Sequence, residues 1–232
     1  MLAKRFIVVL LMLIGSALTH AFNDQQAWEE WLEVGGKRFP LYNYTNRKGQ
    51  PRGSVLLILS AADGQARAFK NLAASLPDHG WNAVAVVIDH DVDDDSDFEK
   101  RVNATMGKLP ELAGKPLVVL SSGQYAQKSA QRFAEGGFTK TTSAFVALNR
   151  PAMNDVKQLR RFHQQNLAVL DISTPALSSN RLRQQRNRLA RELGQKHYRY
   201  MVMPPVSVSR VNSPDALSKR ILSWLNTSYS AG

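Results

Sequence analysis

Two adjacent serines stand between an apolar run and a predicted helix. The apolar run covers residues 116–120, Ser121 and Ser122 follow it, and the helical pattern extends over residues 124–134. A serine hydroxyl at such a junction can act as a nucleophile in acyl transfer when a histidine base and a carboxylate lie beside it. In the structural alternative, the Ser122 hydroxyl caps the start of the helix.

A carboxylate that could serve such a serine lies in another apolar run. Asp171 falls inside the run of residues 167–172 rather than beyond its end. A carboxylate inside a buried strand must be hydrogen-bonded. We therefore predict that Asp171 is a structural hydrogen-bond acceptor.

The histidines do not complete a catalytic set. Chemistry in a parallel sheet gathers at the carboxyl ends of its strands, and His90 follows a predicted strand at that edge but stands among aspartates. Other histidines precede strands or follow a helix: His79, His197 and His163.

Residues 89–97 hold six aspartates and resemble the start of a calcium-binding loop. An EF-hand loop has glycine at its sixth position and an acidic residue at its twelfth. Counted from Asp89, those positions are Asp94 and Lys100, so the loop departs from the pattern. We predict a solvated or salt-bridged loop without a metal, with cation binding as the alternative. No nucleotide, dinucleotide or zinc-protease motif is present, and no cofactor is predicted.

Seven basic residues crowd the predicted helix at residues 178–193 and its exit. They are Arg181, Arg183, Arg186, Arg188, Arg191, Lys196 and Arg199. Helical geometry places the arginines at positions 181, 188 and 191 on one side and those at 183 and 186 off it, so together they predict a broad basic face rather than a narrow stripe. Such a basic face can bind anionic lipid or a polyanionic envelope polymer, and a solvated surface is the alternative. The helix lacks aromatic residues that would stack on bases, so specific nucleic-acid binding is not expected.

The rest of the chain predicts alternating strands and helices. Strands are expected at residues 39–45, 54–60, 81–88, 116–120, 143–148, 167–172 and 198–203. Helices are expected at residues 25–34, 65–76, 97–109, 124–134, 156–162, 178–193 and 214–225. This alternation predicts an α/β protein with a mostly parallel central sheet and helices on both faces, a three-layer sandwich.

The first 21 residues predict a cleavable export signal. Lys4 and Arg5 precede an apolar run at residues 6–18, and Thr19-His20-Ala21 fits a cleavage site before Phe22. The run is shorter than the roughly 20 residues of a membrane-spanning helix, so we expect cleavage, with an uncleaved N-terminal anchor as the alternative. We therefore expect a protein that is periplasmic in a Gram-negative bacterium and secreted otherwise.

Composition bounds what the exported part can be. Cleavage lowers the formal net charge from +11 to +9, and residues 22–232 are predicted to fold as a single domain. The chain has no cysteine, which excludes disulfides, a thiol nucleophile and cysteine-ligated metals.

These segments resemble the α/β-hydrolase fold. More narrowly, they resemble an uncharacterised family of exported bacterial α/β-hydrolase-like proteins, a domain of unknown function. The matching pieces are Asp63-Gly64-Gln65, the turn at residues 76–81, Leu170-Asp171 and the C-terminal residues 217–225. They span about residues 37–225. The resemblance implies the fold, and a fold alone does not imply hydrolysis.

The nucleophile elbow of that fold has the pattern small-x-nucleophile-x-small. In this alignment Gly123 takes the nucleophile position, while Ser121 and Tyr125 take the two small positions. The tip of the elbow has a positive φ, which glycine adopts without strain. Gly123 would therefore keep the turn and remove the nucleophile, and Ser121 or Ser122 would act only after a shift of one or two positions.

At two other site positions the sequence also differs from the usual pattern of the fold. The oxyanion loop, which begins His-Gly in many members, here runs from Ser60 to Gly64. The loop after the last strand, residues 204–210, contains no histidine. We therefore predict a protein of unknown role that lacks an intact triad, has no catalytic residue and binds an envelope component. The alternative is an esterase-like serine hydrolase with a rearranged site that uses Ser122 or Ser121.

Overall fold

A computed structural model describes most of the chain. The described residues are 27–46, 49–60, 66–88, 95–109, 114–138, 142–149, 156–194, 198–203 and 216–229. The predicted export signal lies outside them. No helix within these ranges is long and apolar enough to cross a membrane.

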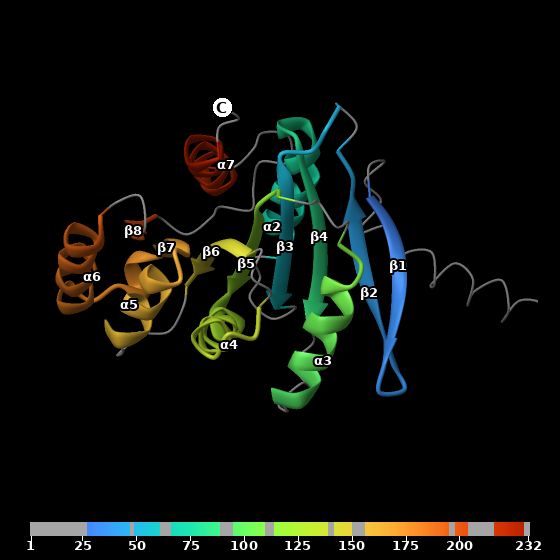
Figure 1. Ribbon diagram of the computed structural model, residues 1–232, viewed down its shortest axis with the longest axis horizontal. Coiled ribbons are helices and arrows are strands. Elements are labelled where there is room, and N and C mark those ends of the chain that lie inside the picture. The colour runs from blue at the N-terminus through green and yellow to red at the C-terminus, as the bar shows by residue number, and fades with distance from the viewer. Residues whose placement is uncertain are drawn as a thin grey trace, which may run out of the picture.

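Eight strands of the described residues form one sheet in the order β1-β2-β4-β3-β5-β6-β7-β8 (Figure 1). The strands are β1 (Ala27–Val34), β2 (Lys37–Tyr44), β3 (Gly53–Ser60), β4 (Trp81–Ile88), β5 (Leu117–Ser122), β6 (Thr142–Leu148), β7 (Ala168–Ser173) and β8 (Tyr198–Val202). β1, β2 and β4 pair antiparallel, and every other neighbouring pair is parallel. This confirms the predicted α/β class and the mostly parallel sheet.

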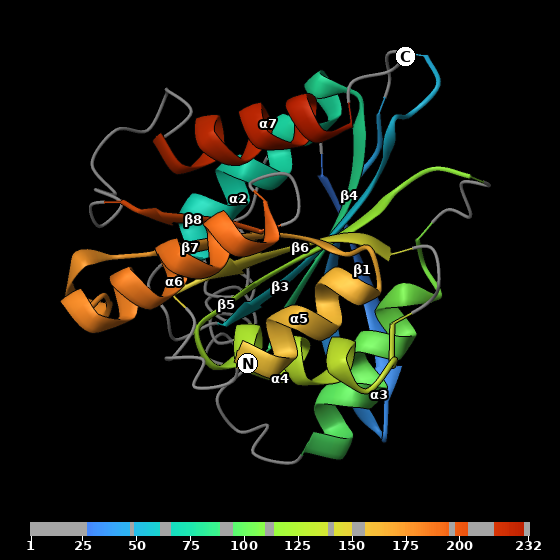
Figure 2. The ribbon, with the colours of Figure 1, turned by 60° about the vertical axis from the view of Figure 1, so that its left-hand side comes forward.

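Helices cover both faces of the sheet (Figure 2). They are α2 (Ala66–Ser75), α3 (Asp95–Met106), α4 (Gly123–Ala134), α5 (Val156–Gln164), α6 (Asn180–Leu193) and α7 (Ala216–Ser228), with short 3-10 helices η3 (Leu76–His79) and η4 (Pro175–Leu177). Apolar side chains of α2 and α7 pack on one face, and those of α3, α4, α5 and α6 pack on the other. The three predicted layers are therefore present.

The inner strands are buried on both faces because their side chains alternate between the two cores. In β3, Val55, Leu57 and Leu59 contact the α2 and α7 side, whereas Leu56 and Ile58 contact the opposite side. A continuous apolar run is the sequence pattern of such a strand. Burying each of these side chains contributes about 1.5–3 kcal/mol to folding.

The prediction of a helix at residues 25–34 is wrong. This segment forms β1, which pairs antiparallel with β2 through a two-residue turn. Gly35 and Gly36 both have positive φ, 58° and 75°, as a type I′ hairpin turn requires. Leu32 points into the core, but Trp31 is 51% exposed and does not pack on it. Gly35 and Gly36 thus form the turn of a hairpin rather than the end of a helix.

Candidate active site

The junction of β5 and α4 forms a tight strand-to-helix elbow. β5 continues through Ser121 and Ser122, two residues beyond the predicted end, and α4 begins at Gly123. Ser122 is extended, with φ −124° and ψ 155°, and the next residue turns sharply, because Gly123 has φ 54°. This left-handed conformation costs about 1–2 kcal/mol for a residue with a Cβ atom. The tip of the elbow therefore suits glycine.

Both serines of the elbow are buried. Ser121 is 0% and Ser122 is 1% exposed. Among the described residues the Ser121 hydroxyl has no hydrogen-bond partner. The Ser122 side chain makes no capping bond to α4, so the prediction that it caps the helix is wrong. Both hydroxyls are therefore enclosed by protein.

Tyr125 fills the position where the elbow motif has a small residue. Its side chain is fully buried in the first turn of α4. The ring stacks on Phe98 of α3, with 5.8 Å between centroids and 9° between planes. The space behind the elbow is therefore packed by an aromatic pair.

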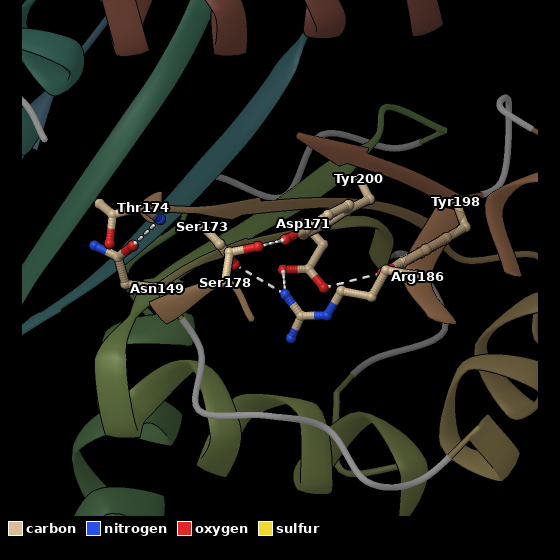
Figure 3. Close-up of polar contacts among 8 residues, drawn as sticks. All are labelled: Asn149, Asp171, Ser173, Thr174, Ser178, Arg186, Tyr198 and Tyr200. Carbon is tan, nitrogen blue, oxygen red and sulfur yellow. Dashed lines mark hydrogen bonds and ion pairs between the residues drawn. The ribbon is translucent and has the colours of Figure 1, made fainter. Parts of the chain in front are cut away.

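Asp171 is held inside the sheet by an arginine and a tyrosine (Figure 3). It lies in β7 and is 0% exposed. The Tyr198 hydroxyl donates to Asp171 Oδ2 at 3.0 Å, and Arg186 Nη1 lies 3.3 Å from Oδ1. Arg186 also donates to Ser173 Oγ at 2.9 Å. The prediction that Asp171 is a structural acceptor is confirmed.

The placement of Arg186 on the basic face is wrong. Arg186 is only 2% exposed, and it lies on the buried stripe of α6 between Leu182 and Leu189. Its guanidinium stacks over the Tyr200 ring at 5.0 Å, and the Tyr200 hydroxyl shares a hydrogen bond with Ser178 Oγ. The sequence signal was present, because positions 182, 186 and 189 share one helix face.

The exposed basic surface of α6 is therefore smaller than predicted. Four arginines of the helix lie at the surface: Arg181, Arg183, Arg188 and Arg191. Arg199 of β8 is also exposed, and Lys196 lies outside the described residues.

The two histidines that the structure describes lie away from the elbow. His79 ends η3 directly before β4, and His163 lies in the last turn of α5 before β7. Both therefore sit at the amino edge of the sheet, whereas Gly123 sits at the carboxyl edge. His90 and His197 fall outside the described residues, as do residues 61–65 and 204–215.

Two carboxylates near the start of α3 pair with arginines. Asp97 pairs with Arg101 at 3.4 Å, and Glu99 pairs with Arg132 of α4. Arg132 also donates to Asn103 at 2.6 Å, and its burial lowers the pKa of the guanidinium. Among the described residues no cluster of histidine and carboxylate side chains could hold a metal ion. Residues 89–94 of the aspartate-rich loop lie outside the described part.

Comparisons with known proteins agree with this architecture. No protein-family model matches the sequence, and no curated protein matches it either. Among solved structures, the esterase domain of a Rhodothermus marinus protein has a TM-score of 0.62 at 9% identity, covering 87% of this chain and 99% of that domain. A soluble variant of monoglyceride lipase from Saccharomyces cerevisiae has a TM-score of 0.65 at 10% identity, covering 90% of this chain and 98% of the lipase.

A third neighbour is the thioesterase domain from the curacin biosynthetic pathway. Its TM-score is 0.60 at 12% identity, and the match covers 84% of this chain and 99% of that domain. Identities this low show the fold alone, because one fold serves many functions. With its mostly parallel eight-stranded sheet, its two helical layers and its glycine-tipped elbow after β5, the chain has the α/β-hydrolase fold.

Proposed function

We propose that this protein is an exported member of the α/β-hydrolase fold that lacks a working Ser/His/Asp triad and binds an anionic component of the cell envelope. One observation carries the proposal. The residue at the tip of the elbow is Gly123, with φ 54°, and the serines that precede it are buried. The position that presents a nucleophile in this fold therefore presents a hydrogen atom.

The carboxylate supports the same conclusion. A catalytic acid must accept a hydrogen bond from the histidine base. Asp171 instead accepts from Tyr198 and pairs with Arg186, and it is fully buried. Moving it to a histidine would leave Arg186 charged and unpaired in the protein interior, which costs several kcal/mol.

Export and binding are supported by the sequence. Residues 1–21 carry the three-part pattern of a signal peptide, and the remaining chain has an excess of nine positive charges. Envelope polymers and bilayer surfaces outside the cytoplasm are rich in anionic groups, so a cationic exported protein is attracted to them.

The alternative function is a serine hydrolase. It is favoured by the names of the structural neighbours, which include an esterase domain, a lipase and a thioesterase domain. Such an enzyme would use Ser122 or Ser121 after a rearrangement that opens the end of β5. This alternative predicts that the protein hydrolyses esters catalytically.

Ester hydrolysis distinguishes the two functions. The purified exported protein is assayed with p-nitrophenyl acetate and p-nitrophenyl butyrate, beside the Ser121→Ala/Ser122→Ala variant and an active esterase. We expect the protein and the variant to release nitrophenol at the same background rate. A rate for the protein at least tenfold above that of the double variant would replace our proposal with the serine hydrolase.

A further inference from the structure

An open groove of about 510 Å³ lies between α6 and β8, at the lateral edge of the sheet. Its described lining comes from one stripe of the helix and one stretch of the strand: Asn187, Ala190, Arg191, Arg199, Tyr200 and Met201. We call this the α6–β8 groove. Among the described strands β8 pairs with β7 alone, and three strand-to-strand steps, about 14 Å, separate it from β5 and the elbow. The groove is therefore a different place from the candidate active site.

Two arginines line the groove, one from each of these elements. Arg191 belongs to α6 and Arg199 to β8, and both side chains are exposed. Arg191 uses Nε on its own helix, donating to the Asn187 carbonyl at 3.4 Å. In the described part of the chain, neither arginine pairs with a carboxylate.

The charge of the groove is not compensated from within α6. The helix contains a single acidic residue, Glu192, among four exposed arginines. Glu192 is paired with Arg160 of α5 at 2.7 Å, which directs its carboxylate toward α5. The cations of the groove thus retain their attraction for an external anion.

The wall of the groove is fixed by buried contacts (Figure 3). Tyr200 is held on its ring face by Arg186 and at its hydroxyl by Ser178. Arg186 in turn is anchored to Asp171 of β7. A wall that is rigid before binding does not lose conformational entropy when a ligand arrives. The buried network that replaces a catalytic acid therefore also shapes this surface.

We propose that the α6–β8 groove binds the phosphate group of an anionic ligand. Guanidinium groups donate paired, charge-assisted hydrogen bonds to phosphate oxygens, and two of them approaching from different elements can bind different oxygens. The amide of Asn187 supplies neutral donors beside them. The volume is within the range of small-ligand pockets and admits a phosphate with the group that carries it.

This inference rests on the proposed function only in expecting the ligand in the envelope. It does not depend on the absence of hydrolysis, because the groove is separate from the elbow. The phosphate can come from a soluble polyphosphate chain or from a lipid headgroup, and the two sources require different probes.

The test measures binding of two probes by the purified exported protein at low ionic strength. Sodium tripolyphosphate is titrated by calorimetry, and vesicles of phosphatidylglycerol and phosphatidylcholine are tested by co-sedimentation. The groove variant is Arg191→Gln/Arg199→Gln. The matched control is Arg181→Gln/Arg183→Gln, which removes the same charge from exposed positions of α6 that do not line the groove. Thermal unfolding checks that both variants are folded.

We expect the groove variant to weaken binding at least tenfold and the control variant to change it less than threefold. If the groove variant alone loses binding of tripolyphosphate, the source of the phosphate is a soluble polyphosphate. If it alone loses binding of vesicles, and tripolyphosphate does not bind, the source is a lipid headgroup. If both variants weaken probe binding equally, the probes are attracted by the net charge of the protein, and the proposal is overturned. It is also overturned if neither probe binds. Ester hydrolysis by the protein would overturn the proposed function and leave this result unchanged.

Discussion

Asp171 is a buried carboxylate with a structural role. It lies in β7, is 0% exposed and is paired with Arg186. The apolar run around Asp171 predicted the structural role, because a carboxylate within a buried strand needs partners. The identity of the partner could not be predicted, because Arg186 lies 15 residues along the chain and approaches only after α6 packs on the sheet.

The first prediction concerns this buried pair. Asp171→Asn removes the charge that balances Arg186, and we expect the free energy of unfolding to fall by about 3–5 kcal/mol. Urea denaturation measures the change. The double variant Asp171→Leu/Arg186→Met replaces both charges with apolar groups and should recover most of that loss. A single variant within about 1 kcal/mol of the natural protein would show that the pair is not a buried ion pair in solution.

The elbow at Gly123 was predicted in part from the sequence. Alignment with the elbow motif predicted where a positive φ would fall, and the backbone of Gly123 has it. The prediction that Ser122 caps α4 failed because β5 continues through that residue, which turns its side chain into the packed interior. That Gly123 has no catalytic role stays a prediction.

Helices and strands were predicted correctly where the hydrophobic pattern continues over many residues. The five central strands β3 to β7 and the helices between them match the sequence pattern closely. β1 was misread because Trp28, Trp31 and Leu32 fit a helix over only two turns. A short segment of this kind is ambiguous, and the two-residue Gly-Gly turn is the stronger signal.

A second prediction tests the packing at the start of β3. A Cβ atom on Gly53 would lie 2.4 Å from the Pro116 carbonyl oxygen and 2.7 Å from Trp81 Cζ3. The strand cannot shift easily, because the Ser54 amide donates to that same oxygen at 3.0 Å. We expect Gly53→Ala to lower the free energy of unfolding by about 2–3 kcal/mol.

Gly107→Ala is the matched control for this substitution. Its Cβ atom would meet nothing closer than 3.5 Å, so the free energy of unfolding should change by less than about 1 kcal/mol. Equal effects of the two substitutions in urea denaturation would contradict the tight packing at Gly53.

A third prediction concerns the end of α7. The Tyr229 hydroxyl donates to the Ser143 carbonyl at 3.0 Å, and the ring meets Trp81 edge-on at 5.9 Å. Burial raises the pKa of Tyr229 to about 12. Because the folded state favours the neutral phenol, stability is unaffected below pH 10, the ordinary pKa, and falls as the pH rises from there toward about 12.

The measurement compares the natural protein with Tyr229→Phe. Over this alkaline range the free energy of unfolding should fall by up to about 2 kcal/mol more in the natural protein. At pH 8 the variant should be less stable by about 1 kcal/mol, the value of one hydrogen bond. Parallel pH profiles for the two proteins would show that the phenol is not buried in solution.

At the scale of the whole molecule, alternating strands and helices predicted the three layers. The order of the strands could not be predicted, because apolar runs of similar length can pair in many orders. The folded order places the ends of β5 and β7 at one edge of the sheet and makes β8 the last of the described strands. The glycine-tipped elbow and the α6–β8 groove therefore lie at separate places on the sheet.

The central claim is that this fold carries no working serine nucleophile here. The most direct test exposes the purified protein without residues 1–21 to a fluorophosphonate probe, which modifies activated serines, and maps any modified peptide by mass spectrometry. We predict no modification under conditions that fully label an active control hydrolase. Modification of Ser121 or Ser122, lost in the matching serine-to-alanine variant, would contradict the account and identify the protein as a serine hydrolase with a rearranged site.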